Sequence, residues 1–206
     1  YEAFSITSSE LPLLYFEVFE NYEQFLPDTS RNFVLNPIPC ISFEEYTNAI
    51  NTIKNEIANG NTYEVNYTYD FGISFTGNDF ELFQSLIAKQ KTAYNFYLKN
   101  QYDTVLSFSP ELFFKLKNKH IITKPMKGTI KRGITQEEDK KFIDFLQNDE
   151  KNRAENVMIV DLLRNDLGRI AKTGSVKVSK LFEIETHKTL HQMTSQIEAD
   201  LRDDIT

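Results

Sequence analysis

The sequence predicts an α+β fold in which helices flank largely antiparallel β-sheets. Two observations carry this prediction. Short runs of strand-like residues follow one another closely between residues 94 and 123, and predicted helices lie in groups on either side of them. Runs of strands that are broken by pairs of helices are typical of α+β folds, whereas a parallel sheet requires strands and helices that alternate.

The composition is that of an ordinary globular domain and excludes several classes of protein. The 206 residues are 40% hydrophobic and 26% charged, which is enough to bury a core without disulfides. Cys40 is the only cysteine, so neither an internal disulfide nor a cysteine zinc site can form. The net charge of −7 disfavours nucleic-acid binding, and no apolar stretch is long enough to cross a bilayer. We therefore expect a cytoplasmic protein with no nucleic-acid or membrane partner.

Residues 1–91 predict two helices and a boundary between regions. Short strands near 13–18 precede a proline-containing connection at 31–41, where we place the boundary. Ser42 and Glu45 have the spacing of a capping box, and a helix with an apolar stripe follows them as far as Gly60. The alternating residues 62–75 predict a strand or hairpin, and a second helix is expected at 79–91.

The remainder predicts four strands, two helices, a fifth strand and a last helix. The four strands are expected at 94–99, 104–108, 112–116 and 120–123, and a turn centred on Asn118 joins the last two. Thr135 and Glu138 form a second capping box, which begins a helix that runs through Leu146. A longer helix at 153–167 should end at Gly168, and a strand at 175–180 and a helix at 190–201 should follow.

One basic window stands out in this acidic chain. Between Glu111 and Glu137 there is no acid, and the seven basic residues are Lys115, Lys117, Lys119, Lys124, Lys127, Lys131 and Arg132. The lysines near the turn are expected to be solvated, whereas the segment 124–133 contains helix- and strand-breaking residues and predicts a cationic loop that could bind an anion. A turn centred on Asn118 places Glu111 opposite residue 125 and diagonal to Lys127. A carboxylate and an amine would meet there, either as a structural salt bridge or as part of a site.

Two other groups of polar residues predict less. His187 and His191 have the i, i+4 spacing that can bind zinc on a helix, but the pattern H-E-x-x-H is absent and we expect no zinc site. In the long helix, Glu155 and Asp161 lie about 600° apart around the axis, so they do not share a face.

Several stretches, in order along the chain, resemble the motifs of the chorismate-utilising enzymes. They are GNTYEVN at 60–66, SPE at 109–111, PMKGTIKRG at 125–133, RAENVMIVDLLRNDLG at 153–168, and GSV at 174–176 followed by the segment 191–195. The resemblance covers about residues 43–206. It implies a fold like that of anthranilate synthase component I, with 42–206 as the first part of the chorismate-binding domain and 1–41 as a remnant of an N-terminal region.

The resemblance also implies the roles of individual residues. Lys127 would attack C2 of chorismate as the 4-hydroxyl leaves, and Glu111 would act as general acid and base. Glu155 would help to hold Mg²⁺ at a substrate carboxylate. Substrate-binding positions are implied at Gly128, Thr129 and His191.

Position 127 indicates which reaction the resemblance favours. A lysine there is typical of the members that aminate chorismate to 4-amino-4-deoxychorismate, in the synthesis of para-aminobenzoate and folate. Their ammonia comes from a separate glutamine amidotransferase subunit. Members that make anthranilate usually have an alanine at this position, and an enzyme of that kind, or another chorismate-utilising enzyme, is the alternative.

Three departures from the family pattern and one missing segment qualify the resemblance. Glu64 replaces a usual glutamine, Asn152 a frequent acid, and Gln192 a frequent histidine. The chain begins at Tyr1, and the G-S-x-T-G-A-P-K segment that completes the site in the family is absent. We therefore expect a fragment that is inactive on its own, and a non-catalytic binding module is a further alternative.

Overall fold

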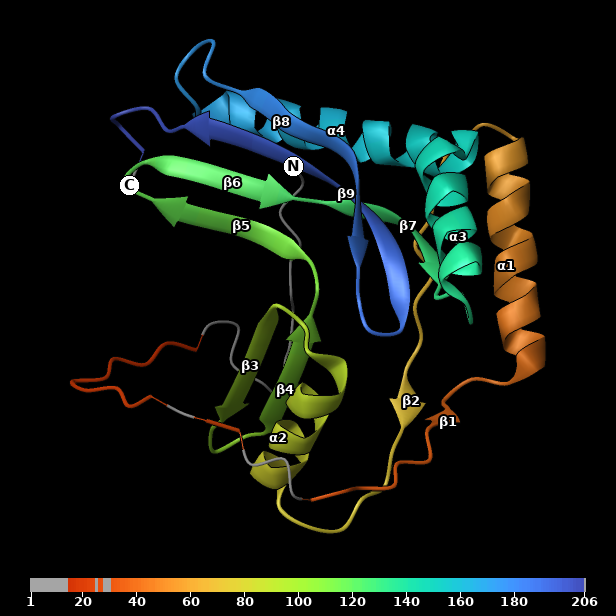
Figure 1. Ribbon diagram of the computed structural model, residues 1–206, viewed down its shortest axis with the longest axis vertical. Coiled ribbons are helices and arrows are strands. Elements are labelled where there is room, and N and C mark those ends of the chain that lie inside the picture. The colour runs from red at the N-terminus through yellow and green to blue at the C-terminus, as the bar shows by residue number, and fades with distance from the viewer. Residues whose placement is uncertain (1–14, 25, 28–30, 206) are drawn as a thin grey trace. The chain divides into compact units, whose positions relative to one another are not determined.

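The computed structural model describes residues 15–24, 26–27 and 31–205 (Figure 1). The chain divides into two compact units, one formed by Leu26–Ser85 and the other by Tyr1–Phe25 with Leu86–Thr206. The boundary that we predict between residues 41 and 42 stays a prediction. Residues 15–18 of the predicted short strands are not in a strand, and residues 13 and 14 lie outside the described residues.

The unit 26–85 contains strand β1 (Ile38–Pro39), helix α1 (Phe43–Ala58), strand β2 (Phe71–Gly72) and the first turns of helix α2 (Asp79–Gln90). The first capping box is confirmed, because the Glu45 amide donates to Ser42 Oγ and the Ser42 amide donates to Glu45 Oε2. The strand predicted over 62–75 is wrong except at β2, which pairs with β1. The alternating tyrosines Tyr67 and Tyr69 of this segment instead pack around Tyr46 of α1. Their ring centroids lie 6.1 and 5.8 Å from that of Tyr46.

The other unit contains two antiparallel sheets. Strands β3 (Tyr94–Lys99) and β4 (Thr104–Ser109) form a two-stranded sheet. The second sheet contains β5 (Leu112–Lys117), β6 (His120–Lys124), β7 (Met126–Lys131), β8 (Lys177–Thr186) and β9 (Leu190–Asp200). Every strand pair is antiparallel, which confirms the predicted fold class.

Strand β9 is the centre of the five-stranded sheet. It pairs with β8 along one edge and with β6 and β7 in succession along the other. The helix predicted at 190–201 is therefore wrong. Alternate residues from His191 to Leu201 are buried, as a period of two requires of a strand, and the neighbouring Thr194 is buried as well.

Two helices cover one face of this sheet, where the core lies. Helix α3 (Gln136–Asn148) begins after its predicted cap Thr135, and helix α4 (Glu150–Ile170) runs along the strands (Figure 1). Helix α4 begins three residues earlier than predicted, because Asp149 caps it, and it continues through Gly168. The core residues that α4 and the sheet share are Ile121, Val160, Leu167, Ala171, Ile197, Ala199 and Leu201.

Asp139 of α3 joins the end of β7 to the β8–β9 hairpin. Its carboxylate accepts hydrogen bonds from the Arg132 side chain, the Gly133 amide and Nε2 of the fully buried His191. Arg132 also donates to the His187 carbonyl, at 2.9 Å. The Arg132 guanidinium, and to a lesser extent the Gly133 amide, holds the pKa of the Asp139 carboxyl well below its usual range.

Among the described residues, no helix is both long and apolar enough to cross a membrane.

We expect Ile197→Ala to lower the free energy of unfolding by about 2–5 kcal/mol, because it leaves a cavity in the shared core. Ile197 is fully buried. Leu116→Ala in the edge strand β5 is the matched control, since 46% of Leu116 is exposed, and it should cost roughly 0.5 kcal/mol. Urea unfolding at pH 7 measures both values. Equal losses would contradict this placement of the core.

The low pKa of Asp139 predicts a loss of stability in acid. Below the ordinary aspartate pKa of about 3.9, the unfolded chain takes up a proton that the folded chain does not, so the stabilisation is lost as the pH falls. Asp139→Asn should therefore be less stable than wild type at pH 7, and the gap should narrow towards pH 3. Urea titrations at several pH values test this, with Asp144→Asn on the exposed side of α3 as control. Parallel curves for wild type and Asp139→Asn would disprove it.

Candidate functional site

A one-residue bulge in β7 is the centre of the candidate site. Met126 pairs with Thr194 of β9, and Thr129 pairs with Gln192. Between these pairs, two residues of β7, Lys127 and Gly128, oppose the single residue Met193 of β9. A bulge of this kind turns a side chain away from the regular alternation and is common beside active sites. The loop predicted at 124–133 is thus wrong, since these residues extend the sheet, but the bulge interrupts the ladder at Lys127.

Gly128 is required at this bulge for two reasons. Its φ of +95° lies in a region that residues with a side chain rarely adopt. A Cβ on Gly128 would also lie 2.9 Å from Oδ1 of Asn152. Asn152 itself is fixed in the first turn of α4, because its amide and its Nδ2 both donate to the capping residue Asp149. The start of α4 therefore packs against the bulge that carries Lys127.

Glu111 reaches the same bulge from the start of β5. Its Oε1 accepts a hydrogen bond from the Met126 amide at 3.2 Å. Leu112 pairs with Lys124, which is the register that a turn centred on Asn118 predicts at this end of the hairpin. The turn itself differs from the prediction, because it has two residues, Asn118 and Lys119, instead of a single central residue. A bulge between Leu112 and Lys115 then shifts the pairing by one residue, so that Leu112 pairs with Lys124 as predicted.

Two pockets lie on either side of the segment 109–111. Ser109 and Glu111 line a pocket of about 340 Å³ whose far wall includes Ile159 and Leu163 of α4. Pro110 lines a second pocket, of about 350 Å³, between the end of α2, β4 and the β8–β9 hairpin. Glu111 therefore accepts a hydrogen bond from β7, the strand that carries Lys127, and also lines the first pocket.

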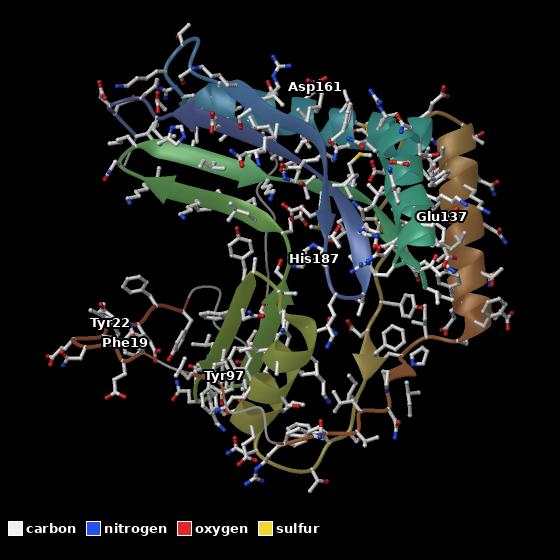
Figure 2. All side chains as sticks on the ribbon, viewed as in Figure 1. Phe19, Tyr22, Tyr97, Glu137, Asp161 and His187 are labelled. Carbon is white, nitrogen blue, oxygen red and sulfur yellow. The ribbon has the colours of Figure 1, made fainter. Side chains whose placement is uncertain are left out.

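The second pocket contains polar groups that the sequence does not predict as ligands. His187, which Figure 2 labels between β8 and β9, and Gln192 both line it. The atoms His187 Nε2 and Gln192 Oε1 are buried and have no hydrogen-bond partner within the described part of the chain. Buried polar atoms without partners are costly, and a bound ligand or water would satisfy them. Gln192 pairs with Thr129, which places this pocket beside the predicted substrate-binding residue.

Glu155 lies one helical turn beyond Asn152 on α4. Residues three apart on a helix lie on the same side, so its carboxylate is on the side of α4 that meets the β7 bulge. It forms a loose ion pair with Lys151, at 3.8 Å, and a third of its side chain is exposed. The next residue, Asn156, is buried and accepts a hydrogen bond from Ser195 Oγ at 2.5 Å, which fixes the rotation of α4 over β9. No group of three or more potential metal ligands occurs among the described residues.

His191 has a different environment from the other predicted residues. Its ring is completely buried, with Nε2 bonded to Asp139 and Nδ1 to Thr186 Oγ1. This geometry supports a structural role, and the prediction that His191 contacts substrate stays a prediction. His187 and His191 do not lie on a helix, so their i, i+4 spacing creates no shared face.

Comparisons with known proteins identify the family of this chain. The sequence model of the family described as chorismate binding enzyme matches residues 11–206, a longer region than the motifs cover. The chain is 38% identical over 161 residues to aminodeoxychorismate synthase component 1 of Salmonella typhimurium, which covers 78% of this chain and 36% of that protein. It is also 38% identical over 160 residues to anthranilate synthase component 1 of Aquifex aeolicus, covering 78% of this chain and 32% of that protein.

A solved structure shows the same architecture. The crystal structure of anthranilate synthase component I from Streptococcus pneumoniae matches with a TM-score of 0.74 and 29% identity, over 84% of this chain and 38% of that chain. The present chain thus spans about a third of the length of these proteins. Because the family model matches residues 11–206, the chain belongs to the chorismate binding enzyme family.

Proposed function

We propose that the protein aminates chorismate at C4 to give 4-amino-4-deoxychorismate, as the first component of an aminodeoxychorismate synthase. The observation that carries this proposal is the bulge in β7 at Lys127 and Gly128, beside the hydrogen bond between Glu111 and Met126. Enzymes of this name are among the relatives with 35–38% identity.

In the proposed reaction, Lys127 is the nucleophile and Glu111 the proton donor. The neutral amine of Lys127 forms a bond from Nζ to C2 of the ring, both ring double bonds shift one position towards C4, and the bond from C4 to its oxygen breaks. Glu111 gives the leaving oxygen a proton, so that it departs as water. Ammonia then bonds to C4 and loses a proton to Glu111, both double bonds return to their original positions, and Lys127 leaves with its electron pair. The two steps exchange water for ammonia and need no oxidant.

Glu155 would be one ligand of a magnesium ion at this site. Mg²⁺ is usually held by one or two carboxylates, with water and substrate oxygens as the other ligands. Glu155 offers such a carboxylate on the side of α4 that meets the bulge, and it forms only a loose ion pair with the exposed Lys151, at 3.8 Å. A bound ion would neutralise charge on a substrate carboxylate.

The remaining residues of the site would hold and orient the substrate. The backbone of Gly128 would line the bound substrate. Thr129 and Gln192 would contribute polar contacts at the edge of the second pocket. Ammonia would come from a separate glutamine amidotransferase subunit, in keeping with the name component 1 that the relatives carry.

Anthranilate formation is the second candidate, because anthranilate synthase components are also among the similar proteins. The product distinguishes the two. Identification by chromatography after incubation with chorismate, Mg²⁺ and an ammonium salt should give 4-amino-4-deoxychorismate, and anthranilate would overturn the proposal.

Lys127→Ala should abolish a covalent adduct. The protein, in the longest form that its gene encodes, is incubated with chorismate and Mg²⁺ without ammonia and examined by intact mass spectrometry. We expect a mass increase of one chorismate less one water on wild type and none on Lys127→Ala. Lys131→Ala, in the same strand, is the control and should retain the adduct. Full amination by Lys127→Ala, or no adduct on wild type, would contradict the covalent role.

Glu111→Gln should slow adduct formation by about 10²- to 10⁴-fold, because the amide cannot donate a proton to the leaving oxygen. The glutamine can still accept from the Met126 amide, so chorismate affinity should change little. Stopped-flow kinetics and equilibrium binding separate the two effects. An unchanged rate would exclude Glu111 as the general acid, whatever the product.

A further inference from the structure

Helix α4 has an exposed stripe of residues centred on Val157. Charged residues at equal distances before and after Val157 have opposite signs. The stripe consists of Glu150, Arg153, Val157, Asp161 and Arg164, spaced three or four residues apart and all exposed. Such spacing places them along one face of the helix. Arg153 and Asp161 lie four residues before and after Val157 and carry opposite charges. Glu150 and Arg164 lie seven residues before and after it, and there the order of the signs is reversed.

This stripe borders a shallow groove with apolar walls. The groove lies between α4 and β8, and its lining residues are Arg153, Ala154, Val157, Met158, Asp161, Leu181 and Phe182. The Arg153 guanidinium stacks over the Phe182 ring at 4.5 Å, which fixes a positive charge at one end. Asp161, which Figure 2 labels on α4, fixes a negative charge at the other end and forms an ion pair with Arg164 at 2.9 Å. Leu181 is 48% exposed and Val157 38% exposed.

A second copy of α4 matches this surface when it runs antiparallel. A two-fold axis through Val157 places Arg153 against the partner's Asp161, and Glu150 against the partner's Arg164. The symmetry repeats both pairs, so that four ion pairs surround a contact between the two Val157 side chains. A parallel arrangement would place like charges against each other and is disfavoured. A surface that complements itself in this way is what a two-fold symmetric contact requires.

We propose that the chain associates with a second copy of itself through the α4 groove, with the two helices antiparallel and the symmetry axis at Val157. The apolar walls of the groove supply the attraction, and the charges set the direction and register of the helices. Exposed ion pairs contribute little energy each and are screened by salt. The dimer should therefore be weak, concentration-dependent and less populated at about 1 M salt. This proposal does not depend on the reaction proposed above.

Cysteine cross-linking tests the axis. The exposed free Cys40 is first replaced by serine, to remove its background reaction. Helices that pack 8–10 Å apart bring the α-carbons on the axis within disulfide reach, so Val157→Cys should form a disulfide-linked dimer under mild oxidation. Asn165→Cys is the matched control on the same helix, because its two copies would lie about 24 Å apart. Equal cross-linking of both variants, or of neither, would overturn the proposal.

A charge exchange tests the register in solution. Arg153→Glu and Asp161→Lys should each raise the dissociation constant about tenfold in analytical ultracentrifugation, since each places like charges together twice per dimer. Mixing these two variants restores opposite charges at every contact, so the mixture should form heterodimers while each variant alone stays monomeric. Circular dichroism verifies that each variant is folded. A mixture that remains monomeric, or a wild-type chain that is monomeric at all concentrations, would show that another partner or none occupies the groove.

Discussion

The opposition of two residues in β7 to the single residue Met193 in β9 determines the geometry of the candidate site. A regular ladder would direct Lys127 to one of the two faces by strict alternation. The extra residue breaks that alternation, and it is possible only because Gly128 adopts a positive φ and leaves room for Asn152. The start of α4, the strand β5 through Glu111 and the strand β9 through Gln192 all meet at this one irregularity.

The network around Asp139 explains why this irregularity can be tolerated. A bulge weakens the ladder locally, yet β7 cannot shift along β9 without breaking the contacts of Arg132 and Gly133 with Asp139 just beyond its end. The same carboxylate holds His191, the residue of β9 that pairs within two positions of the bulge. The strand is thus fixed at its far end by charged hydrogen bonds and at its near end by Glu111.

Local signals in the sequence predict most elements, and partners distant in the sequence decide the rest. The caps at Ser42 and Thr135 and the strands of the hairpin 112–124 depend on neighbouring residues, and their predictions are confirmed. Strand β9 resembles a helix in the sequence because Leu190, Met193 and Ile197 also recur every three or four residues. Only pairing with β6, β7 and β8, which are remote in the sequence, determines its conformation. Motifs point to the site residues in β7 and at Glu111. The pocket that His187 and Gln192 share depends on tertiary packing, and neither the spacing of His187 nor the motif position of Gln192 predicts it.

The central position of β9 also has a consequence for the order of folding. Its three partner strands are complete when residue 186 has been made, but they cannot join into one sheet until residues 190–200 are available. Contacts between β9 and β7 close a loop of about sixty residues, which makes them slow to form relative to the local hairpin of β5 and β6. During synthesis the edges of β6 and β7 therefore stay unpaired until β9 has been made. In this interval the nascent chain is most prone to aggregate.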